Sequence, residues 1–257
     1  MATSTQPAEP IRFWQTKLHR PRLVAGLLRR PRLESRLEWG LDHNLILVSA
    51  PAGFGKTTLV IQWLEARGYP AAWLSLHEDD ANLITFLHLL IAAIRSLYAD
   101  ACPKTWAMLE ALQEPPAEEL AINLVNELCE VSPDFLLVLD DYHRVKSRPV
   151  HKLVETLVEH MPPSLHLVLA TRADPPLRLA TLRAGHQVLE LRAGDLRFTP
   201  DEVEAYLEQF VGLEADPALL TALAQRTEGW IVGLRLAALW LREGRELTAP
   251  ARNFGGT

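Results

Sequence analysis

The sequence predicts an α/β fold with three layers, in which a central parallel sheet of about five strands is followed by a small all-α subdomain. Two observations predict it. Short, nearly all-apolar runs alternate with amphipathic stretches up to about residue 195, and only amphipathic stretches follow. A Gly-Lys-Thr-Thr sequence comes shortly after the first apolar run, where it can join a strand to a helix.

The apolar runs are the expected strands. Because they are apolar at nearly every position, they are typical of a parallel sheet that helices cover on both faces. These runs are residues 45–49, 71–75, 135–139, 165–170 and 188–191.

Helices are expected between these strands, where apolar residues recur at helical spacing. The Pro-containing stretch 101–116 is expected to be a loop. The expected helices of the α/β part are residues 57–67, 82–98, 117–130 and 149–160.

The N-terminal stretch 11–40 is basic and contains a near-repeat, Arg-Pro-Arg-Leu at 20–23 and again at 30–33. Its prolines would interrupt a long helix, so a short helix on each side is expected. At the other end, residues 199–202 form a capping box with Pro200 at the first helical position, which predicts a helix. Two more helices are expected, one from Asp216 and one over 230–242.

These elements predict the domain organisation. It comprises a disordered tail, an α/β domain, a helical subdomain and a truncated linker, at residues 1–15, 16–195, 196–246 and 247–257.

Composition excludes several classes of protein. The net charge of −6 argues against a chain that grips a nucleic-acid backbone by itself. Cys102 and Cys129 lie far apart without metal-ligand spacing, so a reducing compartment is expected. The first ten residues lack the apolar segment of a signal peptide, and no apolar run approaches the roughly 18 residues of a membrane span. A cytoplasmic location follows by elimination.

Residues 50–58 read Ala-Pro-Ala-Gly-Phe-Gly-Lys-Thr-Thr, which is a Walker A phosphate-binding loop (P-loop) with Ala50 in place of the usual first Gly. The two glycines let backbone N–H groups face the phosphates of ATP or ADP. Lys56 is expected to contact the β- and γ-phosphates, and the Thr57 hydroxyl to bind Mg²⁺. The expected nucleotide-binding residues of the loop are Ala52, Gly53, Phe54, Gly55, Lys56, Thr57 and Thr58.

Two carboxylates follow the third expected strand. At the carboxyl end of a buried parallel strand they would point into the ligand crevice of an open α/β sheet. Asp140 is the expected Mg²⁺ partner, and Asp141 is expected to orient or deprotonate the attacking water. A surface turn after a strand is the alternative interpretation of this pair.

Arg172 follows the fourth strand, where a guanidinium can contact the γ-phosphate. A salt bridge on a strand–helix turn is the alternative. His143, near the aspartate pair, is assigned no chemistry. The apolar face from Trp230 to Leu241 indicates core packing, with a nucleotide contact at the Gly229-Trp230 turn as a second hypothesis.

Five segments resemble the signal-transduction ATPases with numerous domains (STAND), specifically the MalT-like large LuxR-type transcriptional regulators. They are residues 16–22, 137–143, 169–177, 191–199 and 227–234. The sequence departs from the family pattern at Ala50 and at residues 79–82.

The resemblance implies that Pro21 and Arg22 lie near the adenine, and that a slow ATP hydrolysis switches the protein between resting and active states. It also implies self-association in the ATP-bound state. Inducer and DNA would be bound by C-terminal regions that this chain does not contain. Two alternatives remain open, a nucleotide-binding oligomerisation scaffold that has lost catalysis and a small-molecule kinase.

Overall fold

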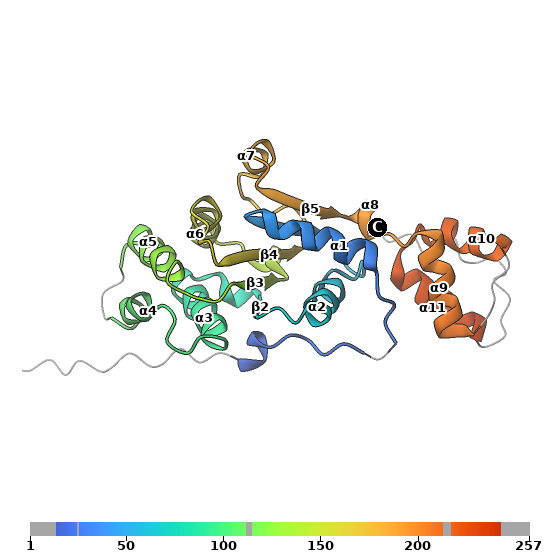
Figure 1. Ribbon diagram of the computed structural model, residues 1–257, viewed down its shortest axis with the longest axis horizontal. Helices are drawn as coiled ribbons and strands as arrows, with labels where there is room; N and C mark the ends of the chain where they lie inside the picture. The colour runs from blue at the N-terminus through green and yellow to red at the C-terminus, as the bar shows by residue number, and fades with distance from the viewer. Residues whose placement is uncertain (1–13, 25, 112–114, 213–216, 243–257) are drawn as a thin grey trace, which may run out of the picture.

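A computed structural model describes residues 14–24, 26–111, 115–212 and 217–242 (Figure 1). Its centre is an all-parallel sheet of five strands in the order β2-β3-β4-β1-β5. The predicted fold class is therefore confirmed. The strands are β1 (Leu45–Ser49), β2 (Ala71–Ser75), β3 (Phe135–Asp140), β4 (Leu165–Thr171) and β5 (Val188–Arg192).

Helices cover both faces of the sheet, as the apolar strands require (Figure 1). Alternate side chains of β1 enter different cores: Leu45 and Leu47 pack in one, Ile46 and Val48 in the other. The first core is completed by α3 (Leu83–Arg95), α4 (Pro103–Glu110), α5 (Ala117–Leu128), α6 (Arg148–Glu159) and α7 (Leu179–Ala184). The second core is completed by α1 (Pro31–Trp39), α2 (Lys56–Arg67) and the short α8 (Ala193–Leu196).

The prediction of a loop over 101–116 was wrong, because α4 lies within it. Cys102 adopts a left-handed conformation (φ 52°) and Pro103 takes the first helical turn. The free N–H groups of that turn are satisfied by the buried carboxylate of Glu127, which accepts from Lys104 N at 2.7 Å and from Thr105 N at 2.9 Å. Glu127, which is distant in sequence, thus stabilises α4. The helix is too short for its apolar periodicity to predict it from the sequence.

The N-terminal stretch has helices at its two ends and extended or irregular chain between them. A 3₁₀ turn at Gln15–Leu18 is held against the core by a buried ion pair, Lys17 to Asp80 at 2.6 Å. The second Arg-Pro repeat begins α1, with Pro31 at its first position. Most of the predicted tail 1–15 and all of the predicted linker 247–257 lie outside the described residues.

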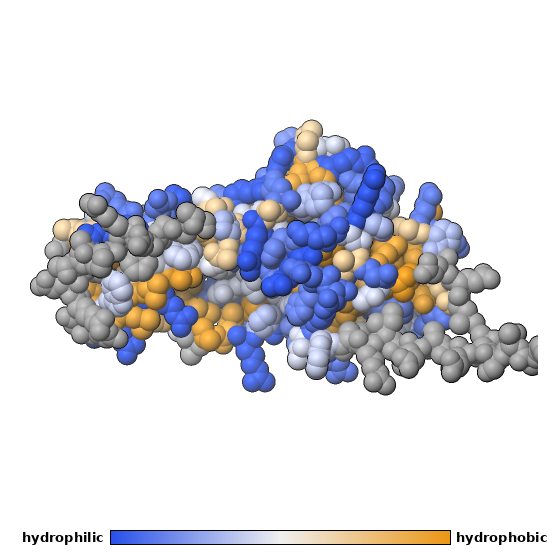
Figure 2. All heavy atoms as spheres, turned by 180° about the vertical axis from the view of Figure 1, so that it is seen from behind, coloured by the Kyte–Doolittle hydropathy of each residue, from blue (hydrophilic) through white to orange (hydrophobic). Residues whose placement is uncertain are grey.

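After α8 the chain forms three helices, α9 (Pro200–Val211), α10 (Pro217–Thr227) and α11 (Ile231–Arg242), around a core of their own. The capping box of α9 is present, since Thr199 Oγ1 accepts from Glu202 N at 3.3 Å. Figure 2 shows hydrophobic side chains gathered at the end of the molecule that holds these helices, and α11 leaves Val232, Leu236 and Leu239 exposed. We call α9–α11 the helical subdomain.

The strand order brings three carboxyl ends side by side, because β4 lies between β3 and β1. The register pairs Ser49 of β1 with Thr171 of β4, and Leu139 of β3 with Leu169 of β4. The P-loop, the aspartate pair and Arg172 follow these three strands. The topology therefore places the predicted site residues at one edge of the sheet.

Candidate functional site

The P-loop joins β1 to α2 and is held closed by its own lysine. Gly53 and Gly55 have φ of 78° and 74°, a conformation that side chains disfavour. Lys56 is buried, and its Nζ donates to the carbonyl oxygens of Ala50 at 2.8 Å and Pro51 at 2.9 Å. Burial lowers the pKa of Lys56, an effect that the negative charges of Asp141 and Asp140 oppose.

Ala50, the departure from the Walker A pattern, is 2% exposed and belongs to the core that α1 and α2 cover. A small residue is required there because the strand enters the loop inside a packed layer. Ala50 does not have a positive φ, so its methyl group causes no backbone strain. The positive φ values of the loop are at Gly53 and Gly55.

Asp140 and Thr57, 83 residues apart in sequence, meet at the base of the loop. Thr57 Oγ1 donates to the Asp140 carboxylate, 3.0 Å from Oδ1 and 3.1 Å from Oδ2. Burial, together with the charge of Asp141, raises the pKa of Asp140 to about 6. A desolvated carboxylate beside a hydroxyl fits the oxygen ligands that Mg²⁺ prefers.

The protein ligands available to a cation here are few. Within the described parts of the chain, no group of three or more His, Cys, Asp and Glu side chains could hold a metal ion. Mg²⁺ in nucleotide sites needs only one or two protein ligands, because phosphate oxygens and water complete its shell. The Thr57–Asp140 pair matches that requirement.

Asp141 adopts a left-handed conformation (φ 56°) at the turn after β3. Its carboxylate is 38% exposed and lies 3.8 Å from His143 Nδ1 and 3.7 Å from Arg144 Nε. Burial lowers the pKa of His143, so a neutral imidazole is favoured. Asp141 is thus an accessible carboxylate beside the Lys56 charge.

Arg172 is exposed and lies close enough to Lys56 and His143 for its charge to lower the pKa of both. It forms no ion pair with any residue that the structure describes. The salt-bridge interpretation therefore lacks a partner in the described chain, while the Arg172 charge acts on the P-loop lysine.

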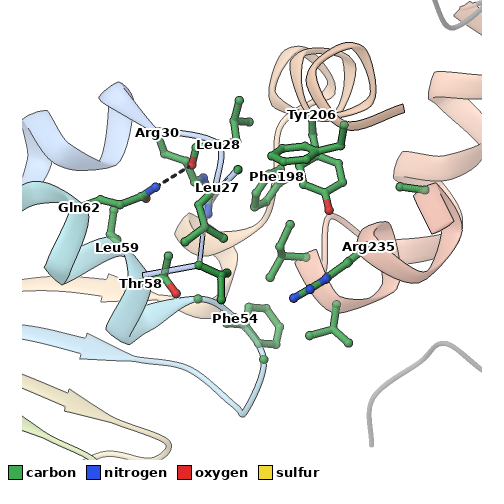
Figure 3. A pocket seen from close by; sticks show the side chains of 18 of the residues that line it. Leu27, Leu28, Arg30, Phe54, Thr58, Leu59, Gln62, Phe198, Tyr206 and Arg235 are labelled. Carbon is green, nitrogen blue, oxygen red and sulfur yellow. Dashed lines mark hydrogen bonds between the residues drawn. The ribbon is translucent and has the colours of Figure 1, made fainter. Parts of the chain in front are cut away.

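A cavity of about 380 Å³ opens beside the loop, between α2, the N-terminal stretch and the helical subdomain (Figure 3). It contacts the loop at Gly53, Phe54 and Gly55. Among the described residues that line it, three are arginines and none is an acid. The remaining lining is mostly apolar: Val24, Gly26, Leu27, Leu28, Thr58, Leu59, Gln62, Phe198, Tyr206, Phe210, Ile231, Val232, Ala238 and Leu239.

The predicted adenine contacts Pro21 and Arg22 are exposed and do not line this cavity. Later residues of the same stretch do, namely Val24, Gly26, Leu27, Leu28 and Arg30. Gly26 permits this approach, because it has φ of 82° and a Cβ there would lie 2.6 Å from Phe210 Cε1. Gly26 was the residue in the sequence that could have indicated where this stretch approaches the cavity.

The arginines of the cavity differ in their partners. Arg30 is buried and fully engaged, donating to Glu202 Oε2 at 2.8 Å and to the Leu196 carbonyl at 2.8 Å. Arg235 and Arg242, both on α11, form no hydrogen bond or ion pair with described residues. Arg235 points into the cavity in Figure 3. The open part of the cavity is therefore suited to an anionic ligand.

Comparison with known proteins finds relatives of this chain among curated proteins and solved structures. No protein-family model matches the chain. The serine/threonine-protein kinase PknK of Mycobacterium tuberculosis (strain H37Rv) is 34% identical over 258 residues, which are 99% of this chain and 23% of that protein. The transcriptional regulator MalT of Klebsiella pneumoniae (strain MGH 78578) is 32% identical over 244 residues, 94% of this chain and 27% of MalT.

Among solved structures, Cdc6p of Pyrobaculum aerophilum matches with a TM-score of 0.50 and 17% identity, covering 91% of this chain and 67% of that one. This likeness concerns the fold. The chain spans about a quarter of the length of the curated relatives it matches. Over nearly its full length, the chain is homologous to a segment of about a quarter of MalT and of PknK, and its fold is that of a P-loop NTPase, like the fold of Cdc6p.

Proposed function

We propose that this chain binds ATP or ADP with Mg²⁺ and acts as the nucleotide switch of a cytoplasmic, MalT-like transcriptional regulator. The observation that carries the proposal is the contact of Thr57 with the buried Asp140 carboxylate, beside a P-loop closed by Lys56. Residues from two strands and one helix meet in the arrangement that phosphate and a divalent cation require.

The cavity is where the nucleoside would bind in this proposal. Its volume and its mostly apolar lining are those of small-ligand sites. Leu27, Leu59 and Phe198 offer apolar surface to a base, while the loop glycines lie at one side of the same cavity. Phosphates held at the loop would therefore leave the base among these side chains.

The chemistry of the site divides among its residues. Thr57 and Asp140 would hold Mg²⁺, which when bound neutralises charge on the β- and γ-phosphates. Lys56 contacts the same phosphates from within the loop. Asp141, accessible and beside the loop, orients or deprotonates the attacking water, and Arg172 contacts the γ-phosphate. Hydrolysis is slow in this proposal, so that the nucleotide state persists as a signal.

The relatives support a regulatory role. A protein named as a kinase and a protein named as a transcriptional regulator share this segment, although it makes up about a quarter of each. Because the segment is shared by proteins with different names and activities, a regulatory switch suits it better than either activity itself. We propose that ATP favours self-association of this module, and that inducer and DNA are bound by C-terminal regions of the full-length regulator.

In the described residues, every helix is too short or too polar to cross a membrane.

The proposal is tested by identifying the nucleotide that the purified protein retains and by titrating the nucleotide-free protein with ATP·Mg²⁺. Release of ATP or ADP on denaturation is expected, together with saturable binding of both. Neither retained nucleotide nor measurable binding would contradict the proposal.

Lys56→Ala is expected to abolish ATP binding, because the phosphates lose the cation of the loop. It should also lower the melting temperature, since the Ala50 and Pro51 carbonyls lose their donor, at a cost of about 1–3 kcal/mol. Calorimetric titration and thermal unfolding measure both effects. The control is Lys152→Ala, on the exposed face of α6, which should bind as wild type.

Asp140→Asn is expected to stabilise the nucleotide-free protein at pH 7.5. A carboxyl whose folded pKa is raised to about 6 contributes stability below its unfolded pKa of 3.8 and loses it as pH rises through 6. Removing the charge should recover about 1–3 kcal/mol at pH 7.5 and little at pH near 4. Thermal unfolding at the two pH values measures this, and the same variant should weaken the Mg²⁺ dependence of ATP binding.

Asp141→Asn is expected to keep nucleotide affinity and to slow turnover, because this carboxylate lies outside the Thr57–Asp140 contact. Phosphate release measured beside ATP affinity separates the two effects. Loss of nucleotide binding in this variant would reverse the roles assigned to the two aspartates.

Arg172→Ala is expected to weaken ATP binding roughly ten- to a hundredfold and ADP binding much less, because ADP lacks the γ-phosphate. Dissociation constants for both nucleotides test it. Arg178→Ala is the control, since Arg178 is engaged by Glu155 and Glu159 on α6. Equal losses for ATP and ADP would contradict a γ-phosphate contact.

A further inference from the structure

The Trp230 side chain lies between two glycines, one in the P-loop and one in the helical subdomain. A Cβ built on Gly53 would lie 3.0 Å from Trp230 Nε1, and a Cβ built on Gly233 would lie 3.2 Å from Trp230 Cε3. Both are closer than side chains tolerate without rearrangement. The indole therefore fits against the loop on one side and against α11 on the other.

The indole nitrogen is buried, yet it has no hydrogen-bond partner among the residues that the structure describes. A buried donor left unpaired is costly, and native structures contain few of them. The Ala50 and Pro51 carbonyls of the same loop accept from Lys56. The Trp230 N–H therefore lacks an acceptor in the described chain. It lies beside a loop that precedes a helix N-terminus, and such loops bind anionic oxygens.

The turn that carries Trp230 is held firmly in place. Phe198 N donates to the Gly229 carbonyl at 2.9 Å, and Trp230 N donates to the Thr227 carbonyl at 2.8 Å. Gly229 has φ of 69°, and a Cβ there would lie 2.7 Å from the Phe198 carbonyl oxygen. The indole cannot move far from the loop unless the helical subdomain moves with it.

We propose that the indole N–H of Trp230 donates a hydrogen bond to a phosphate oxygen of the nucleotide held by the P-loop. Trp230 then positions the helical subdomain according to nucleotide occupancy. This inference rests on the nucleotide binding proposed above. It assigns Trp230 a role beyond core packing.

The test is titration of the 257-residue protein with ADP·Mg²⁺, in wild type and in two Trp230 variants. Trp230→Phe keeps an aromatic ring and removes the donor. Replacement of Trp230 by benzothienylalanine keeps the shape of the indole and puts sulfur in place of N–H. Each is expected to weaken ADP binding about ten- to a hundredfold, the effect of losing one hydrogen bond to a charged group.

Trp106→Phe is the matched control. Trp106 lies on α4, away from the loop, and its Nε1 donates to Glu110 at 2.8 Å. This variant should bind ADP as wild type.

Wild-type affinity in the benzothienylalanine variant would overturn the indole contact, because only the N–H has changed. A variant that loses affinity and melts far below wild type would also overturn it, by showing a packing role. Absence of ADP binding in wild type would instead overturn the proposed function, and this inference with it.

Discussion

Strands β1, β3 and β4 lie between two helical layers, and the polar residues of the site lie where these strands end. The sheet order makes these three strands neighbours, and their carboxyl ends lie at one edge. Lys56, Asp140 and Arg172 are placed there by strand order alone, before any contact between them forms. The Thr57–Asp140 contact then depends on α2 starting directly at the loop.

The cavity depends on a different link, the buried Arg30. Its guanidinium pairs with Glu202 of α9, donates to the Leu196 and Arg197 carbonyls, and lies 4.2 Å from the centre of the Phe198 ring. Removing one member of a buried ion pair is strongly destabilising, because the other charge remains desolvated. Arg30 therefore ties the N-terminal stretch to the helical subdomain, and the cavity lies between the parts it joins.

Periodicity and motif spacing predicted most of the fold, because the strands are apolar at nearly every position and the site residues lie at or just after their carboxyl ends. Two features could not be read this way. Helix α4 is capped by Glu127, which lies in the next helix, so its stability is not local in sequence. The cavity-lining residues Val24, Gly26, Leu27, Leu28 and Arg30 have no helical or strand period, and their position depends on tertiary contacts with Phe210 and Glu202.

The two proposed phosphate contacts differ in what they can signal. Arg172 extends from the sheet and would contact a group that only ATP has, whereas Trp230 extends from the helical subdomain and would contact phosphates common to ATP and ADP. A ligand shifts a conformational equilibrium only by its differential affinity for the two states. Trp230 alone would therefore close the subdomain on either nucleotide, and discrimination between ATP and ADP must come from the sheet side of the site. A switch built in this way separates the sensing of occupancy from the sensing of the γ-phosphate.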